Sequence, residues 1–435
     1  MVRRRPNYPQ LNLDDFETLS AWYRGYRKLL ADNRPTLRRE AVPPPSLRRV
    51  LRILSGESLS DPDLLAILSF CRYCEFIYLE RLRSEGLAPI LTLTIDGESF
   101  RAVSIHSVYF AANPTGRAGR SYFLTGKQFA FELSVAWVAT TGFSIDVRNS
   151  PVLGISHENE GDEVRIGAVK SPFATDEHWC YLDTPIESRK SARVTGYQHG
   201  EESIVRAFEC AADAGCEVIV FPELTVTPVA LSALRSRLAQ GSPKWRVRIV
   251  VAGSWHLVEG SDTAHFRNRA TVLGPHGDVA WVQDKLEPFF CRHNGKEITE
   301  PTIGSRDVFV REGSRLGRVT VSICSDFCNL IGIPHFLQQV FPSLVCVPTM
   351  QVIGSSEVFG AQAIVLAKQT HATSVVANVR VDGRESTQGD TASGQRLEPF
   401  VRTPLGEAGK LARERERDDE FEVLVFRVYR REHSV

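Results

Sequence analysis

The sequence has no uninterrupted apolar run of the ~18 residues that a membrane-spanning helix needs, although 43% of its 435 residues are hydrophobic. Its first residues, Met1-Val-Arg-Arg-Arg-Pro, have no apolar segment behind the arginines, so we expect no secretory signal. The nine cysteines are odd in number and widely scattered, which fits reduced thiols better than a disulfide scaffold. We therefore expect a soluble, cytoplasmic protein.

Net charge is also absent, because 52 Lys and Arg residues balance 52 Asp and Glu residues. This balance gives no electrostatic reason to expect nucleic acid or a membrane as a partner. Basic residues do gather near the start, for example at Arg3–Arg5 and Arg24–Lys28. They fit either an arm that meets an acidic partner or a solvated surface, and such runs more often form a solvated surface.

The sequence pattern changes near residue 160, where the polar stretch His157–Glu163 separates two regions. Upstream of it, helical spacing at Leu13–Leu30 and Asp61–Leu82 gives way to β-branched and aromatic runs over Ile90–Val147. We therefore predict an α+β domain over residues 1–160, and its sequence does not indicate a role.

Downstream, residues 161–435 alternate short apolar strands with helices, which is typical of a layered α/β fold. The expected strands are Val164–Val169, Val218–Phe221, Val247–Ala252, Ala270–Leu273, Val279–Val282, Val319–Ile323, Ser343–Val347 and Ser374–Ala377. The expected helices are Glu202–Ala214, Val229–Ala239, Pro334–Val340 and Glu357–His371.

Glu223, Lys285 and Cys324 each stand at or just beyond the end of an expected strand. Strand ends of an α/β sheet converge on one crevice, where ligands and catalytic groups gather. A carboxylate can take the thiol proton, and an ammonium can stabilise the oxyanion that forms when a carbonyl is attacked. Each residue alone has an ordinary explanation, such as a packed thiol or a surface lysine. Together, and in this order, they indicate a catalytic site.

Three blocks carry a resemblance to a known family. Phe221-Pro-Glu223, Lys285-Leu-Glu-Pro-Phe289 and Ile323-Cys-Ser-Asp326 resemble, in order and spacing, the signature blocks of the nitrilase, or carbon–nitrogen hydrolase, superfamily. Other residues also resemble parts of the family pattern that flank these blocks: Asn268, Gly277, Val345-Cys-Val-Pro348, Ala377-Asn378 and Thr403-Pro-Leu-Gly406. The resemblance covers about residues 164–430 and implies an αββα sandwich of the nitrilase type, preceded by the additional α+β domain. It also implies a homodimer or a larger homo-oligomer.

The resemblance implies a role for each reactive residue. Glu223 would be the general base, Cys324 the nucleophile that forms a thioester, and Lys285 the stabiliser of the tetrahedral intermediate. The backbone N–H of Ser325 would be a second oxyanion donor. A lysine neighbour and a helix N-terminus both favour a thiolate, so we expect Cys324 to be the most reactive thiol of the chain.

A further glutamate often assists the triad in this family. Glu287, Glu297 and Glu300 compete for that role, and we favour Glu297. Asp326, two residues after the nucleophile, resembles the amidase-type branches, so the expected substrate is a small amide, ureido or carbamoyl compound. A structural role for Asp326 in orienting the turn explains it equally well.

Other site types have little support. The sequence has no HExxH, Walker A or Rossmann motif. Cys71-Arg-Tyr-Cys74 is a lone CxxC inside a helical pattern, without the four ligands of a zinc site. We expect no metal and no cofactor.

Two functions from different classes follow. The leading one is a thiol hydrolase that cleaves a non-peptide C–N bond through a Glu–Lys–Cys triad. The alternative is an effector or scaffold protein whose nitrilase-like domain serves assembly, or supplies ammonia or acyl groups to a protein partner bound by residues 1–160. The intact set of three residues argues against a catalytically idle scaffold. We also expect residues 161–435 to fold without residues 1–160.

Overall fold

The computed structural model of the chain describes residues 92–95, 98–104, 108–113, 135–139, 144–154, 161–172, 179–183, 189–194, 200–259, 262–293, 296–300, 302–328, 337, 340, 342–350, 356–380, 398–404, 406–415 and 421–432. The chain divides into two compact units, Met1–Leu87 and Ala88–Val435. The helices expected at Leu13–Leu30 and Asp61–Leu82, and the Cys71/Cys74 pair, lie outside the described residues.

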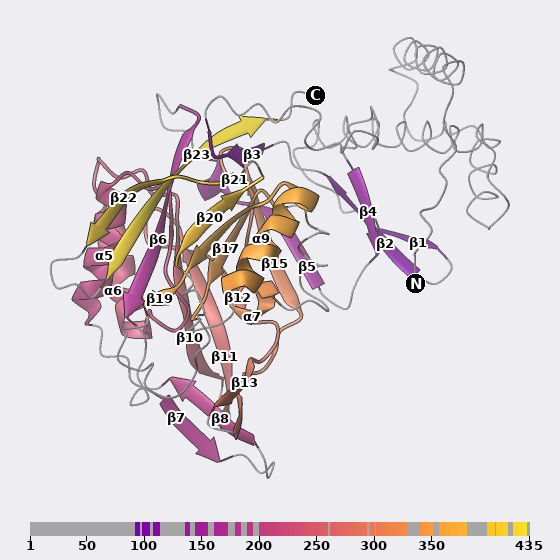
Figure 1. The fold of residues 1–435 in the computed structure, drawn as a ribbon, viewed down its shortest axis with the longest axis vertical. Coiled ribbons are helices and arrows are strands. Elements are labelled where there is room, and N and C mark those ends of the chain that lie inside the picture. The colour runs from indigo at the N-terminus through magenta and orange to yellow at the C-terminus, as the bar shows by residue number, and fades with distance from the viewer. Residues whose placement is uncertain are drawn as a thin grey trace. The chain divides into compact units, whose positions relative to one another are not determined.

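A nine-stranded mixed sheet forms one layer of the second unit (Figure 1). Its strands, in spatial order, are β12 (Val279–Asp284), β11 (Asp262–Leu273), β10 (Ile249–Glu259), β9 (Val218–Val220), β6 (Glu163–Pro172), β23 (Glu422–Glu432) and β22 (Lys410–Arg415), with β3 (Val108–Ala111) paired to β23 and β19 (Val379–Arg380) paired to β6. The short strand β9 runs parallel to both of its neighbours and is wholly buried. Its unbroken apolar sequence suits a strand that is covered on both faces.

A seven-stranded sheet forms the facing layer. Its strands, in spatial order, are β21 (Gly406–Glu407), β20 (Phe400–Thr403), β18 (Thr373–Ala377), β17 (Leu344–Pro348), β16 (Gly317–Val321), β15 (Asp307–Gly313) and β5 (Ser144–Asn149). The two sheets contact each other most through β12 and β15 and through β6 and β18, and also through β9 and β10, which contact β17. Valine, isoleucine and leucine side chains from both sheets fill the space between them.

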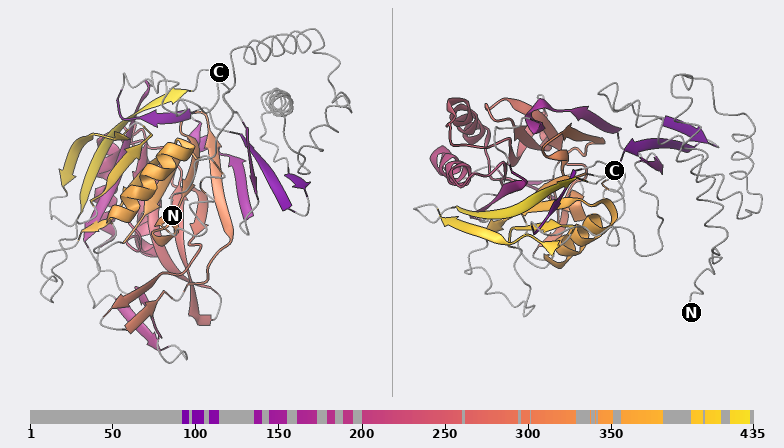
Figure 2. Two further views of the ribbon diagram at one scale, coloured as in Figure 1. Left: turned by 45° about the vertical axis from the view of Figure 1, so that its right-hand side comes forward. Right: turned by 90° about the horizontal axis from the view of Figure 1, so that it is seen from above.

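Helices cover the outer face of each sheet, as Figure 2 shows. Helix α5 (Glu201–Asp213) packs beside α6 (Pro228–Gln240) and against β9, β22 and β23, over a second apolar core. Helix α9 (Ser356–Thr370) packs on β18 and β20 of the other sheet. These layers confirm the predicted αββα sandwich.

Local sequence explains where these helices begin and end. The α5 helix carries Glu201 and Glu202 in its first turn, where carboxylates complement the positive end of the helix dipole. The α6 helix begins at Pro228, behind Thr227, whose hydroxyl accepts the N–H of Ala230 at 3.2 Å, and it ends before Gly241.

Two strands of the sandwich come from upstream of residue 160. β3 pairs antiparallel with β23 in the nine-stranded sheet, and β5 pairs parallel with β15 in the seven-stranded sheet. Leu153, in the short 3-10 helix η1 (Pro151–Leu153), is fully buried in the core between the sheets. The sandwich therefore includes residues on the N-terminal side of the boundary expected at residue 160.

Two smaller sheets complete the described part of the chain. One consists of β1 (Thr92–Ile95), β2 (Glu98–Ser104) and β4 (Val135–Ala139). The other has the order β13-β14-β8-β7, from β7 (Trp179–Asp183), β8 (Arg189–Val194), β13 (Phe290–His293) and β14 (Lys296–Thr299). The second sheet matters for the site because β14 ends one residue before Glu300.

Most of the predicted elements are present, and β10 and β11 extend beyond the predicted ranges Val247–Ala252 and Ala270–Leu273. The helix predicted at Pro334–Val340 lies largely outside the described residues. Among the helices that the structure describes, none combines the length and the apolar character needed to cross a membrane.

Candidate active site

Glu223 lies three residues beyond β9, and its side chain is almost fully buried. Its Oε1 accepts hydrogen bonds from Lys285 Nζ at 2.9 Å and from Asn268 Nδ2 at 2.8 Å. Its Oε2 accepts the backbone N–H of Met350 at 3.2 Å, from the segment that follows β17. The carboxylate is thus held from both sheets, because Asn268 and Lys285 belong to one layer and Met350 to the other.

Lys285 directly follows β12 and is buried between two carboxylates. Its Nζ lies 2.9 Å from Glu223 Oε1 and 2.7 Å from Glu300 Oε2. Burial lowers the pKa of this ammonium, but the charges of Glu223 and Glu300 outweigh burial and raise the pKa well above its ordinary value. Lys285 is therefore a fixed positive charge inside the protein.

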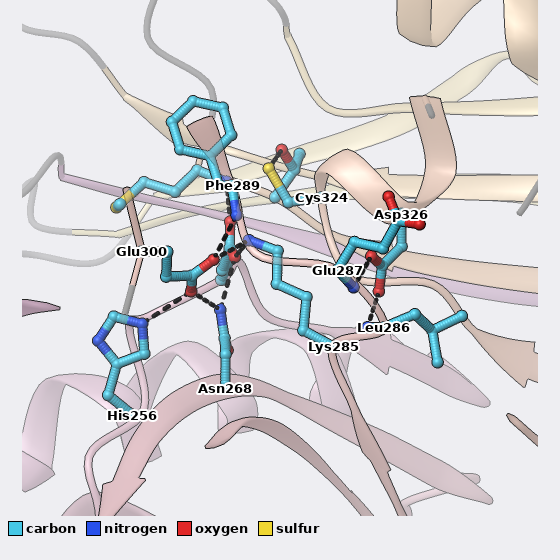
Figure 3. Close-up of polar contacts among 12 residues, drawn as sticks. His256, Asn268, Lys285, Leu286, Glu287, Phe289, Glu300, Cys324 and Asp326 are labelled. Atoms are coloured by element: carbon cyan, nitrogen blue, oxygen red, sulfur yellow. Dashed lines mark hydrogen bonds and ion pairs between the residues drawn. The ribbon is translucent and has the colours of Figure 1, made fainter. Parts of the chain in front are cut away.

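Glu300 is the second carboxylate on Lys285, and Figure 3 shows how it connects the residues around it. Its Oε1 accepts from Asn268 Nδ2 at 2.6 Å and lies 2.8 Å from His256 Nε2. Its Oε2 accepts the backbone N–H of Phe289 at 3.2 Å. Burial raises the pKa of Glu300, but Lys285 and His256 lower it by more than burial raises it. The net pKa therefore lies far below the ordinary value. Glu300 is ionised at any working pH.

Cys324 occupies a sharp turn between β16 and the short helix α7 (Ser325–Cys328). Its backbone φ is 46°, a left-handed conformation that is costly for a residue with a Cβ. The strained turn is held by a hydrogen bond from the Cys324 N–H to Pro348 O at 2.9 Å. A turn of this kind between a strand and a helix presents a nucleophile at the end of a sheet.

The Cys324 thiol lies inside the same cluster. Its Sγ accepts a hydrogen bond from the Thr349 hydroxyl at 3.3 Å, and it also hydrogen-bonds with Glu223. Burial and the negative charge of Glu223 raise the pKa of this thiol well above 9.0, although Lys285 and Thr349 act in the opposite direction. Lys285 thus favours the thiolate, as expected, but burial and Glu223 outweigh it in the net pKa; that Cys324 is the most reactive thiol stays a prediction.

Asp326 connects the turn of the cysteine to the segment of the lysine. Its carboxylate accepts the backbone N–H groups of Leu286 at 2.8 Å and Glu287 at 3.1 Å, directly after Lys285 (Figure 3). Burial raises the pKa of this carboxyl to about 8, although Lys285 and the two N–H groups lower it. These contacts support the structural reading of Asp326. Ser325 begins α7 beside the nucleophile, where the first N–H groups of a helix lack intrahelical partners.

Among the three glutamates that the sequence leaves in competition, Glu300 is the one in contact with Lys285. Glu297, the favoured candidate, lies on β14, where it pairs with Arg292 of β13 and Arg189 of β8. The side chain of Glu287 is exposed to solvent. Glu300 is therefore the glutamate with a described contact to Lys285, and which glutamate assists the triad stays a prediction.

Sequence reasoning assigned no part to His256, and it singled out Asn268 only as a piece of the family pattern. The two residues are direct partners on β10 and β11, and both reach Glu300. The pairing could have been inferred from the sequence if the strand predicted at Val247–Ala252 had been extended to His256. For Glu300 a signal was available, because Asn294-Gly295 is typical of a two-residue hairpin and places Phe289 opposite Glu300.

The cluster combines a thiol, a carboxylate in contact with it and a buried ammonium. These are the groups needed to activate a nucleophile and to stabilise an oxyanion. Within the residues that the structure describes, no group of His, Cys, Asp and Glu side chains could hold a metal ion.

Comparison with known proteins gives a family match for part of the chain. Residues 184–328 match the family model described as carbon-nitrogen hydrolase. No curated protein matches the sequence. Among solved structures, an amidase from Nesterenkonia sp. is 18% identical, with a TM-score of 0.40, and the match covers 62% of this chain and 92% of that one. The NitFhit protein of C. elegans is 15% identical, with a TM-score of 0.39, over 61% of each chain.

The matched region contains Glu223, Lys285 and Cys324. The sequence resemblance is thus confirmed over that region. Residues 184–328 are similar to the carbon–nitrogen hydrolase family.

Proposed function

We propose that this chain hydrolyses a small amide, ureido or carbamoyl substrate through an acyl intermediate on Cys324. One observation carries the proposal. The Cys324 thiol, the Glu223 carboxylate and the Lys285 ammonium share one buried cluster between the two sheets.

Acylation begins with a neutral thiol. Glu223 takes the Cys324 proton as Sγ attacks the carbonyl carbon, so that a C–S bond forms and the carbonyl electron pair moves to oxygen. The buried Lys285 ammonium stabilises this oxyanion, and the N–H of Ser325 is the second donor. A preorganised charge in a water-poor site stabilises a developing oxyanion far better than the same charge would in water.

The intermediate then expels the amine. Glu223 returns the proton to the leaving nitrogen, the C–N bond breaks, and ammonia or an amine departs from a thioester on Cys324. For hydrolysis, Glu223 takes a proton from water as the water oxygen attacks the thioester. The C–S bond then breaks, the carboxylic acid leaves, and the sulfur regains its proton from Glu223.

The high pKa of Cys324 gives this mechanism a particular form. Burial and the charge of Glu223 raise the thiol pKa, so in the proposed mechanism Glu223 takes the proton as sulfur attacks the substrate carbonyl. Glu300 complements this arrangement, because it is a second carboxylate in contact with Lys285 Nζ. Lys285 therefore keeps its position when Glu223 becomes protonated.

The test is a panel of small amides, ureido acids and carbamoyl compounds incubated with the full-length protein. Released ammonia is measured, and the acyl adduct is sought by intact-protein mass spectrometry. We expect turnover that Cys324→Ala abolishes and Cys328→Ala retains, because Cys328 lies one helical turn away on α7. Turnover that survives in Cys324→Ala, or an adduct on another cysteine, contradicts the proposal.

A further inference from the structure

The segment that leaves β17 contacts both the nucleophile and its base. Pro348 O accepts the Cys324 N–H, and Thr349 O accepts the Glu223 N–H at 3.4 Å. The next N–H, from Met350, donates to Glu223 Oε2 at 3.2 Å. Residues 348–350 therefore set the separation between thiol and carboxylate through the backbone.

One side chain of this segment acts on the sulfur itself. Thr349 is fully buried, and its hydroxyl donates to Cys324 Sγ at 3.3 Å. Its backbone N–H donates to Ala377 O at 3.0 Å in the neighbouring strand end, which fixes the residue in place. The hydroxyl is thus a rigid donor aimed at the sulfur.

We infer that Thr349 is a positioning residue that orients the Cys324 thiol toward Glu223 and stabilises negative charge on the sulfur. The hydroxyl donor fills one acceptor position of Sγ, so the thiol proton is directed to the other partner, which is Glu223. During attack, and again when the thioester breaks down, sulfur carries negative charge. A hydrogen bond to a charged acceptor is stronger than one to a neutral acceptor.

The charged groups that act on this sulfur are Glu223, from the loop after β9, and Lys285, from the end of β12. Thr349 is the neutral donor among them, and it lowers the pKa of the Cys324 thiol. Its removal should therefore reduce the thiolate fraction at a fixed pH, whereas a residue that only packs would not affect that fraction.

The experiment compares Thr349→Val, which keeps shape and loses the hydroxyl, with Thr349→Ser, which keeps the hydroxyl. The matched control is Thr370→Val, since Thr370 is also buried but donates to Leu366 O on α9. The first readout is the rate of Cys324 alkylation by iodoacetamide, followed by peptide mapping below the thiol pKa, where the rate tracks the thiolate fraction. This readout needs no substrate.

We expect alkylation about tenfold slower in Thr349→Val, corresponding to the loss of one hydrogen bond to a charged sulfur. Thr349→Ser should restore the rate, and Thr370→Val should match the unchanged protein. Equal rates in Thr349→Val and the unchanged protein, or a slow rate in Thr349→Ser as well, overturn the inference. If Thr349→Val does not fold, Thr349→Ala is compared with Thr349→Ser in its place.

The catalytic part of the inference rests on the proposed function, and a second readout addresses it. On any amide that is turned over, kcat should fall about tenfold in Thr349→Val with little change in KM. If no amide is turned over but the alkylation rates follow the expected order, the proposed function fails while the role of Thr349 stands. If turnover is found but alkylation is unaffected, the role of Thr349 fails alone.

Discussion

Glu223 and Lys285 act on the Cys324 sulfur with opposite electrostatic signs. The carboxylate raises the thiol pKa and the ammonium lowers it. Both nevertheless serve turnover in the proposed mechanism, one as the base and the other as the oxyanion partner. Thiol reactivity and amide turnover therefore report different properties of the same pair.

This difference gives a prediction for Glu223→Gln and Lys285→Met. Turnover should fall in both, by about 10²–10⁴-fold when the base is lost and about 10²–10³-fold when the oxyanion partner is lost. Alkylation of Cys324 at fixed pH should become faster in Glu223→Gln, because the thiol pKa falls, and slower in Lys285→Met, because it rises. Rates that move in the same direction in both variants would show that the pair does not control the thiol in this way.

A second residue-scale prediction separates the glutamates. Glu300→Gln removes a charge 2.7 Å from Lys285 Nζ, so kcat should fall by about 10²-fold. Glu297→Gln, on β14, should change kcat by less than about twofold, because the contact with Lys285 is made by Glu300. Steady-state kinetics on one amide checks both variants, and thermal unfolding verifies that each is folded. The assignment is refuted if Glu297→Gln shows the larger loss of kcat.

At the scale of elements, the turn between β16 and α7 and the segment after β12 are connected through one carboxyl group, that of Asp326. Its pKa is about 8 in the folded protein and 3.8 ordinarily. Between these values the unfolded chain has lost the proton while the folded chain retains it, so rising pH favours unfolding. Above about 8 this penalty no longer increases.

We therefore expect the stability of the unchanged protein, relative to Asp326→Asn, to decrease as pH rises from about 4 to about 8. Urea unfolding at a series of pH values measures this difference. A difference that stays constant across this pH range would contradict the raised pKa.

The sequence predicted those elements whose signal is local. Val218–Phe221 and Val319–Ile323 are apolar runs followed at once by a reactive residue, so both the strands and the convergence of their ends could be inferred. Helical spacing likewise predicted α5, α6 and α9. A strand that is buried on both faces can be predicted from its continuous apolar composition alone.

Elements defined by distant partners were not predictable in this way. β5 is mostly polar and only partly buried, and it pairs with β15, whose residues lie more than 150 positions later. The choice of Glu300 over Glu297 depends on the register of the β13–β14 hairpin, where a shift of one residue turns a side chain to the other face. Neither feature follows from periodicity within a single segment.

At the scale of the whole molecule, the contribution of β3 and β5 changes the expected behaviour of fragments. The sequence led us to expect that residues 161–435 fold alone. That fragment lacks one strand of each sheet and the buried Leu153. The compact unit Ala88–Val435 retains them.

We predict that a fragment starting at Ala88 is soluble and unfolds cooperatively, whereas one starting at Gly161 aggregates or unfolds at a markedly lower temperature. Loss of β5 exposes the edge of β15, and unpaired strand edges promote aggregation. Circular dichroism during heating and size-exclusion chromatography compare the two fragments. Equal stability would mean that β3 and β5 contribute little, and would restore residue 161 as a workable boundary.

Light scattering on the full-length protein tests the predicted homo-oligomer.

The position of β23 in the nine-stranded sheet has a consequence for the order of events in the cell. β23 lies near the end of the chain, yet it pairs with β6 along eight residues, next to the central strand β9. During synthesis on a ribosome, β6 emerges more than 250 residues before its partner is available. The sheet that carries Glu223 and Lys285 can therefore be completed only after β23 has been synthesised. A premature stop codon before β23 would leave β6 paired with β9 but without its long antiparallel partner, and the cell with an unfinished protein for its chaperones and proteases.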